Sequence, residues 1–310
     1  MKFQTKRENR MEHQIGLQTA YWSGTTPTLD IHQIIQFTKK ANMDVIELKA
    51  GDFVSLSKEE RWKLRKEIED VGLSITVNGT GLRAERDISS SDETSHKAGI
   101  KHLCHMLDLS KEMGAKFFSG IPYGLWNARP EADDNVKEMK EIRRENAIKG
   151  LKEVSKYAEE VGVVLCLEIV NRFEQYIANT VEEGIGICEE IHNDYCKLLL
   201  DTFHMNIEED YIPDAIKMAA EKGYLGYIHI GESNRKIPTG RKKTNIDWEA
   251  IAEVLKRIEY KNPLVMESFV LDTSSSAKSV SLWRKMKDSA DINGMVLDAA
   301  EGVKYLRSLL

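Results

Sequence analysis

The chain has 310 residues, of which 41% are hydrophobic and 30% charged, and its net charge is −6. This length allows one large domain, and an acidic balance without a long basic run argues against a nucleic acid as the main partner. No apolar run approaches the roughly 20 residues that span a bilayer, and the N-terminus lacks the apolar core of a signal peptide, so we expect no membrane association and a cytoplasmic protein.

Apolar, strand-like segments alternate with amphipathic helical patterns along the chain. After a predicted flexible extension over residues 1–12, strands are expected at 15–20, 44–50, 73–79, 115–120, 163–169, 197–201, 224–230 and 263–269. Several of the helical stretches between them close on Gly or Asn, a common C-terminal signal of helices. Eight such units without a Pro- or Gly-rich linker predict a single (β/α)8 TIM barrel, of the α/β class, over residues 13–310.

Several familiar site motifs are missing from this pattern. No GxGxxG follows the first strand and no GxxxxGK[ST] occurs, so a dinucleotide fold and a P-loop are both unsupported. No CxxC pair is present either, and we expect reduced, mostly buried thiols rather than a cysteine zinc site at Cys104, Cys166, Cys188 and Cys196.

Acidic or imidazole residues end four consecutive predicted strands. They are Glu168, Asp201, His229 and Glu267. The strand ends of one polarity open onto one face of a barrel, so these side chains are expected to converge. Two Glu, one Asp and one neutral His form a mixed oxygen and nitrogen set that suits a divalent ion such as Mn²⁺, Co²⁺ or Mg²⁺.

Simpler explanations exist for single members of this set. Glu168 alone would be explained by a structural salt bridge, with Arg172 as the candidate partner, because an isolated buried charge is very costly. A lone histidine such as His229 is more often a satisfied core residue. The repetition at four successive strand ends favours a metal site.

Four further residues are candidate substrate contacts. His204 is expected to donate to substrate, with a metal ligand or a helix-start residue as alternatives. Glu174 orients a substrate hydroxyl or is a solvated loop acid, and Arg235 acts as a substrate clamp or charge balance. Trp126 lies in a long connection, residues 122–137, and aromatic rings suit the apolar faces of sugars. The second long connection is 270–294; barrels place substrate contacts and lids in such loops, and plain surface elaboration is the alternative.

The sequence resembles the ketose 3-epimerase family, the group of D-tagatose 3-epimerase and D-allulose (psicose) 3-epimerase. The motifs that carry the resemblance are EIVNRFEQYIANT (168–180), LLLDTFHMNIEE (198–209), HIGESNR (229–235) and MESFV (266–270). Weaker likeness extends from AYW (20–22) through SSSD (89–92) to SLWRKM (281–286). Nearly the whole chain is therefore covered.

The resemblance implies a homodimeric or homotetrameric barrel with a Mn²⁺ or Co²⁺ site and a small ketose as substrate. It implies metal ligation by Glu168, Asp201, His229 and Glu267. Substrate contacts would come from Glu174, His204, Arg235 and Trp126. Gln18 stands where many relatives carry a tyrosine, and Ser268 replaces a common proline, so the preferred ketose stays open between free sugars and acidic derivatives.

The implied reaction interconverts carbon-3 epimers of ketoses, such as D-fructose and D-allulose, D-tagatose and D-sorbose, or L-ribulose and L-xylulose. It removes a proton next to a carbonyl and returns it from the opposite face through an enediolate, which a metal ion stabilises. Glu168 and Glu267 are the candidates for the base and the acid, each also a metal ligand.

Three other functions were weighed. An aldose–ketose 1,2-isomerase on the same barrel needs the same metal and enediolate, and only family likeness separates the two. An abasic-site endonuclease needs several zinc ions, more histidine ligands and a basic groove. A sugar-binding module without catalysis is disfavoured because both carboxylates, Glu168 and Glu267, are present.

Overall fold

The computed structural model describes residues 13–131, 135–287 and 291–310, and the predicted extension at residues 1–12 lies outside these ranges. Eight parallel strands form a closed barrel in chain order. They are β1 (Ile15–Gln18), β2 (Val45–Lys49), β3 (Ser74–Asn78), β4 (Phe117–Gly120), β5 (Val164–Ile169), β6 (Cys196–Asp201), β7 (Leu225–Ile230) and β8 (Leu264–Met266). The predicted (β/α)8 barrel is confirmed, and each predicted strand overlaps an observed one, although β6 begins one residue before its predicted start.

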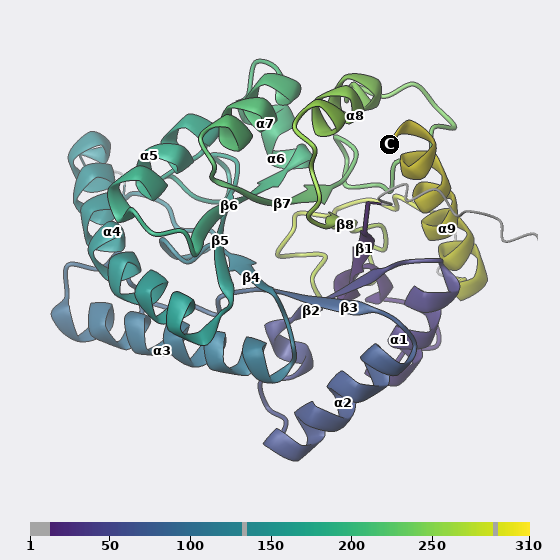
Figure 1. Ribbon diagram of the computed structural model, residues 1–310, viewed down its shortest axis with the longest axis horizontal. Coiled ribbons are helices and arrows are strands. Elements are labelled where there is room, and N and C mark those ends of the chain that lie inside the picture. Colours follow the sequence, from purple (N-terminus) through teal and green to yellow (C-terminus); the bar gives the residue numbers. More distant parts are fainter. Residues whose placement is uncertain (1–12, 132–134, 288–290) are drawn as a thin grey trace, which may run out of the picture.

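Helices surround the strands as an outer ring (Figure 1). They are α1 (Ile31–Lys40), α2 (Lys58–Asp70), α3 (Glu93–Glu112), α4 (Val136–Val161), α5 (Val181–Ile191), α6 (Thr202–Glu208), α7 (Ile212–Glu221), α8 (Trp248–Arg257) and α9 (Ile292–Leu309). Two short 3-10 helices follow the first strands, η1 (Thr19–Trp22) after β1 and η2 (Ala50–Asp52) after β2. The last helix, α9, packs against α1 and so closes the ring.

Local sequence signals explain where several helices begin and end. Reciprocal capping boxes join Asp30 to Gln33 before α1 and Ser57 to Glu60 before α2, so orphan backbone N–H groups are satisfied. Gly162 ends α4 with φ of +78°, a left-handed conformation that glycine adopts without steric penalty. Within the described ranges, every helix is too short or too polar to span a bilayer.

The interior of the barrel is arranged in layers along its axis, because alternate strand residues point inward. A lower apolar layer is formed by Val45, Phe117, Cys166, Leu199, Tyr227 and Val265. Two residues further along the same strands lies a polar layer formed by Glu47, Ser119, Glu168, Asp201, His229 and Glu267. The strand register thus places packed hydrophobic side chains directly beneath the polar ones. Cys166, Cys188 and Cys196 are buried free thiols, and Cys104 is half-buried.

Candidate functional site

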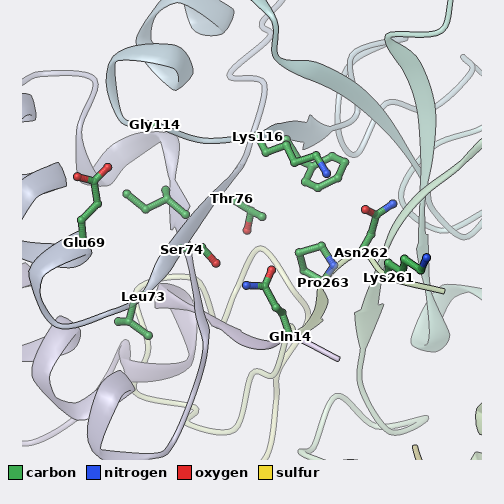
Figure 2. Close-up of a pocket in the computed structure, with 12 residues that line it drawn as sticks. Gln14, Glu69, Leu73, Ser74, Thr76, Gly114, Lys116, Lys261, Asn262 and Pro263 are labelled. Carbon is green, nitrogen blue, oxygen red and sulfur yellow. The ribbon is translucent and has the colours of Figure 1, made fainter. Parts of the chain in front are cut away.

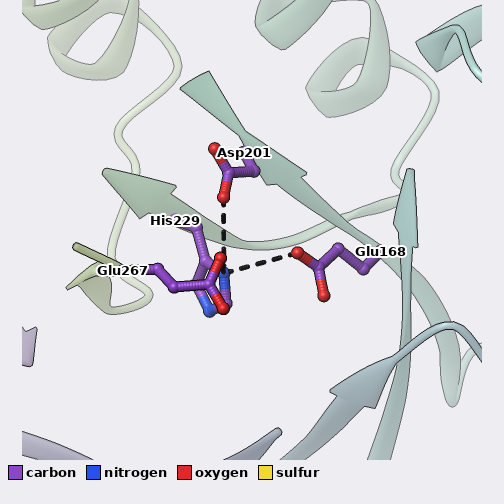
Figure 3. A group of neighbouring side chains, drawn as sticks. All are labelled: Glu168, Asp201, His229 and Glu267. Carbon is purple, nitrogen blue, oxygen red and sulfur yellow. Dashed lines mark ion pairs between the residues drawn. The ribbon is translucent and has the colours of Figure 1, made fainter. Parts of the chain in front are cut away.

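Four polar side chains meet at the carboxyl ends of strands β5 to β8 (Figure 3). They are Glu168, Asp201, His229 and Glu267, and one nitrogen or oxygen atom from each lies within 4.8 Å of the others. All four side chains are buried. The structure therefore brings together the four residues that the sequence placed at successive strand ends.

The His229 ring faces this group through an atom that the protein leaves unsatisfied. Nδ1 of His229 has no hydrogen-bond partner among the described residues. It lies 3.7 Å from Oε1 of Glu168, 3.7 Å from Oδ2 of Asp201 and 3.6 Å from Oε2 of Glu267. An unpaired buried nitrogen surrounded by three carboxylate oxygens is the arrangement that a divalent cation would satisfy. The residues present therefore fit a metal ion.

The carboxyl groups have pKa values that are shifted in different directions. Burial raises the pKa of Glu168 above its usual 4.5, and the Glu267 carboxylate raises it further. Burial also acts to raise the pKa of Asp201 and Glu267, but the Arg235 guanidinium and the His229 ring together lower both below their usual values. For the His229 ring, burial lowers the pKa, while Glu47, Glu267, Asp201 and Glu168 together raise it above its usual value. The four residues are thus electrostatically linked to one another and to Arg235.

A fourth buried acid near this group, Glu47 on β2, lies behind His229, and the sequence analysis did not identify it. Its Oε1 is 2.8 Å from Nε2 of His229, on the side of the ring away from the three carboxylates. Its Oε2 accepts from the Tyr227 hydroxyl at 2.6 Å and from the Thr76 hydroxyl at 3.0 Å. The signal that could have revealed Glu47 is an acid within the apolar run DVIELKA.

Gln18 on β1 connects Glu47 to the candidate catalytic carboxylate. Its Nε2 donates to Oε1 of Glu47 at 3.1 Å and to Oε1 of Glu267 at 2.7 Å. Because Oε1 of Glu267 is held in this way, Oε2 faces the Nδ1 of His229. The other sequence departure, Ser268, is buried, and its hydroxyl has no hydrogen-bond partner among the described residues.

Arg235, in the loop after β7, contacts the four-residue group. Its Nη1 donates to Oε2 of Glu267 at 2.7 Å and also to Oδ2 of Asp201. The guanidinium is 4.2 Å from the centre of the Phe203 ring, within the range of a cation–π contact. Arg235 also has φ of +63°, a left-handed conformation that is rare outside glycine. Arg235 is thus paired with two of the three carboxylates of the group.

His204, in the first turn of α6, is buried beside this cluster. Its Nδ1 accepts from the backbone N–H of Asn171 at 3.2 Å and contacts the Asn171 amide at 2.7 Å. Its Nε2 is 3.0 Å from Nη2 of Arg235 and 3.8 Å from Oε1 of Glu168. His204 therefore lies next to the four-residue group rather than within it.

Two members of the group, Glu168 and Glu267, line a cavity of about 420 Å³. Trp126 lies on its rim, 45% exposed, and its indole N–H donates to Oε2 of Glu174 at 2.7 Å. Both of these residues line the cavity, as do His204 and Arg235. All four predicted substrate contacts thus face one space, whose size suits a small organic ligand.

The alternative prediction for Glu168, a structural salt bridge with Arg172, is wrong. Arg172 instead pairs with Glu208, with Nη2 and Oε2 separated by 2.7 Å. Two tryptophans in the segments of weaker likeness differ in exposure: Trp22 is buried and Trp283 is 74% exposed.

A second cavity, of about 290 Å³, lies at the opposite end of the barrel (Figure 2). Its lining comes from segments where strands begin, including Ser74, Lys116 and Pro263. Its acid, Glu69, is already paired with Arg65 and Lys66. The unsatisfied Nδ1 of His229 lies instead near the carboxyl end of β7, on the face where barrel enzymes place their active sites.

Comparison with known proteins identifies the family of the chain. Residues 35–288 match the family described as xylose isomerase-like TIM barrel. The chain is 33% identical to the D-psicose 3-epimerase of Ruminiclostridium cellulolyticum over 301 residues, 97% of this chain and 98% of that protein. It is 33% identical to the L-ribulose 3-epimerase of Mesorhizobium japonicum over 279 residues, 88% and 87% of the two chains. The crystal structure of D-psicose 3-epimerase with D-tagatose from Clostridium cellulolyticum has a TM-score of 0.87 and 31% identity, covering 96% of this chain and 99% of that one.

Proposed function

The chain belongs to the xylose isomerase-like TIM barrel family, and from this premise we propose that it is a metal-dependent ketose 3-epimerase. It interconverts carbon-3 epimers of ketoses, in line with its relatives D-psicose 3-epimerase and L-ribulose 3-epimerase. The observation that carries the proposal is that Glu168 and Glu267 belong to the same buried four-residue group and line the same cavity. Proton removal and return at one carbon needs two such groups.

The metal-holding residues we propose are Glu168, Asp201, His229 and Glu267, and the favoured ions are Mn²⁺ and Co²⁺. When bound, such an ion polarises a carbonyl and stabilises negative charge on neighbouring oxygens. The unpartnered Nδ1 of His229 supports this assignment, because a neutral imidazole nitrogen is a common metal ligand.

The proton chemistry belongs to the two glutamates. They come from β5 and β8, three strands apart around the barrel, so they approach the base of the cavity from different directions. One carboxylate takes the proton from carbon 3 and the other returns one to the opposite face, and the roles exchange with the direction of reaction. Gln18 holds Oε1 of Glu267 and Asn78 donates to Oε2 of Glu168 at 3.2 Å, which fixes both carboxylates.

The substrate is held by the residues that line the cavity above these carboxylates. His204 and Arg235 present nitrogen atoms toward substrate oxygens, and Glu174 orients a hydroxyl. Trp126 provides an apolar wall for the sugar at the rim. A homodimer or homotetramer and a cytoplasmic location remain predictions, the first tested by light scattering after gel filtration.

Proton NMR in D₂O tests the proposal. Metal-depleted enzyme, with and without added Mn²⁺ or Co²⁺, is incubated with D-fructose, D-allulose, D-tagatose, L-ribulose and L-xylulose. Metal-dependent deuterium at carbon 3, with the epimer appearing, is expected. Deuterium at carbon 1 with an aldose product would identify a 1,2-isomerase instead, and no exchange with any sugar would refute both activities.

A further inference from the structure

Above the polar layer, the barrel presents a third layer of side chains to the cavity, and this layer contains one charge. Gln18 on β1 and Asn78 on β3 lie at the level of the polar layer. Each strand continues two residues beyond this level to a residue of the third layer. These residues are Ala20, Lys49, Thr80, Ile121, Val170, Phe203, Gly231 and Phe269. All of these except Gly231 line the cavity. Among these eight positions Lys49 is the only ionisable side chain. It follows Val45 and Glu47 on the inward face of β2, roughly 7 Å beyond Glu47 along the strand.

We propose that Lys49 recognises the end of the substrate remote from the metal, and that the enzyme prefers ketoses carrying an anionic group there. The inference rests on the proposed ketose 3-epimerase activity and specifies its substrate class. A terminal phosphate and a terminal carboxylate share the chemistry that a lysine ammonium recognises.

The Lys49 ammonium has no ion-pair partner among the described residues. The nearest acid in sequence, Asp52, is turned to other groups: its Oδ2 accepts from the backbone N–H of Lys49 at 2.8 Å and from the Thr19 hydroxyl at 2.5 Å. Other half-buried cations of this protein, such as Lys140 and Arg143, are paired with carboxylates. An unpaired, half-buried cation that faces a cavity can form a charge-assisted hydrogen bond with a bound anion, which would stabilise the complex.

The charges around the cavity leave Lys49 uncompensated. Arg235 pairs with Asp201 and Glu267, and a divalent ion would balance the remaining charge of the metal-holding carboxylates. The other charged lining residue, Glu174, follows β5, three strands from β2 around the barrel, and is bonded to Trp126. Lys49 therefore defines a positive side of the mouth that is separate from the chemistry at carbon 3.

Polar groups that line the same cavity complete the setting of Lys49. The β8–α9 connection contributes the hydroxyl groups of Ser276 and Ser279. The 3-10 helix η2 contributes Gly51, and a Cβ atom built on Gly51 would have no other atom within 4 Å, so the space there is open. The connection is held over the β1–α1 loop by a bond from the Ser274 hydroxyl to the Ser23 hydroxyl at 3.1 Å. Hydroxyl groups and open space beside an ammonium suit the oxygens of an anionic group.

The test compares D-fructose, D-fructose 6-phosphate and the corresponding 6-carboxylate ketose with the Mn²⁺-loaded enzyme. Deuterium incorporation at carbon 3 gives kcat/KM, and calorimetry gives the affinity of each sugar. The variants are Lys49→Met, Lys49→Arg to retain the charge, and Lys63→Met as a matched control on the exposed face of α2.

We expect at least one anionic ketose to exceed D-fructose by roughly 10- to 100-fold in kcat/KM, as charged hydrogen bonds allow. This ratio should collapse toward one in Lys49→Met and persist in Lys49→Arg and Lys63→Met. The phosphate and carboxylate arms identify which anion is recognised. A wild-type preference for D-fructose over both, or an anion preference that survives in Lys49→Met, would overturn the inference.

The two readouts separate this inference from the proposed activity. Anion affinity that depends on Lys49, with no deuterium at carbon 3, would refute the epimerase and retain the recognition by Lys49. Exchange at carbon 3 of D-fructose, without Lys49-dependent affinity for either anion, would retain the epimerase and refute the recognition.

Discussion

Oε1 of Glu47 lies 2.8 Å from Nε2 of His229, and both side chains are completely inaccessible to solvent. The opposite nitrogen, Nδ1, points at Glu168, Asp201 and Glu267. Carboxylates that hold the remote nitrogen of a ligating histidine orient the ring and raise its basicity. Glu47 therefore acts on the candidate metal site through His229.

Replacing this carboxylate should weaken metal binding. In Glu47→Gln we expect the Kd for Mn²⁺ to rise by roughly 10- to 100-fold, as is common when a group behind a metal ligand is removed. Titration of metal-depleted enzyme with Mn²⁺ by calorimetry measures it. Asp87→Asn is the control, because Asp87 is also a buried acid but pairs with Arg143 outside the cavity. An unchanged Kd in a folded Glu47→Gln protein would assign Glu47 a packing role only.

The two glutamates at the base of the cavity should each be needed for turnover. Glu168→Gln or Glu267→Gln removes a proton-transfer group, whose contribution is typically at least about 100-fold. We expect circular dichroism to show a folded protein while carbon-3 deuterium incorporation nearly disappears. Glu153→Gln, on the exposed face of α4, should behave as wild type. Substantial exchange in either site variant would contradict the two-carboxylate assignment.

Metal removal should lower thermal stability as well as activity. An ion bound only by the folded state, at 100 times its Kd, stabilises that state by about 2.7 kcal/mol. Scanning calorimetry of chelator-treated enzyme should therefore show a lower Tm, restored by Mn²⁺ or Co²⁺. The Asp201→Asn variant should lose most of this rise, because Asp201 belongs to the converging group. Equal Tm values with and without Mn²⁺, in wild-type enzyme, would argue against an ion at this site.

The aromatic rim should influence binding more than chemistry. Trp126→Ala removes an apolar wall and the donor to Glu174, and we expect KM to rise by roughly 2- to 10-fold, as for loss of an aromatic contact. The value of kcat should change less. Trp126→Phe keeps a ring without the N–H group and separates the two contributions in steady-state kinetics. A KM equal to that of wild type in Trp126→Ala would place the ring outside the substrate path.

The strands could be predicted because each is a largely apolar run. The four converging residues could be predicted because β5 to β8 each carry a polar residue at or next to the carboxyl end. Glu168 and His229 are the next-to-last residues of β5 and β7, Asp201 is the last of β6, and Glu267 follows β8 directly. In a closed parallel barrel, strand ends alone determine that such residues meet. No side-chain geometry was needed for that step.

The roles of Glu47, Lys49 and Gln18 could not be predicted in the same way. A strand buried on both faces reads as a continuous apolar run, so its inward and outward residues are not distinguished by the sequence. The register of β1 against β2, which pairs Gln18 with Glu47, becomes visible only in the folded barrel. The pairing of Arg235 with Asp201, and of Arg172 with Glu208, likewise depends on how loops fold over the strand ends.

The apolar layer beneath the carboxylates limits the route by which solvent hydrogen reaches them. Six packed side chains fill the barrel there, with Cys166, Leu199 and Tyr227 directly below Glu168, Asp201 and His229. If carbon 3 of a ketose is held at these carboxylates, a hydrogen taken from it would exchange with water through the mouth of the cavity. Substrate recovered after partial reaction would keep its original isotope to the extent that the sugar stays bound, while the epimer would carry solvent hydrogen. The amount of solvent hydrogen in the recovered substrate, relative to that in the epimer, would measure how often hydrogen exchanges with water during one turnover.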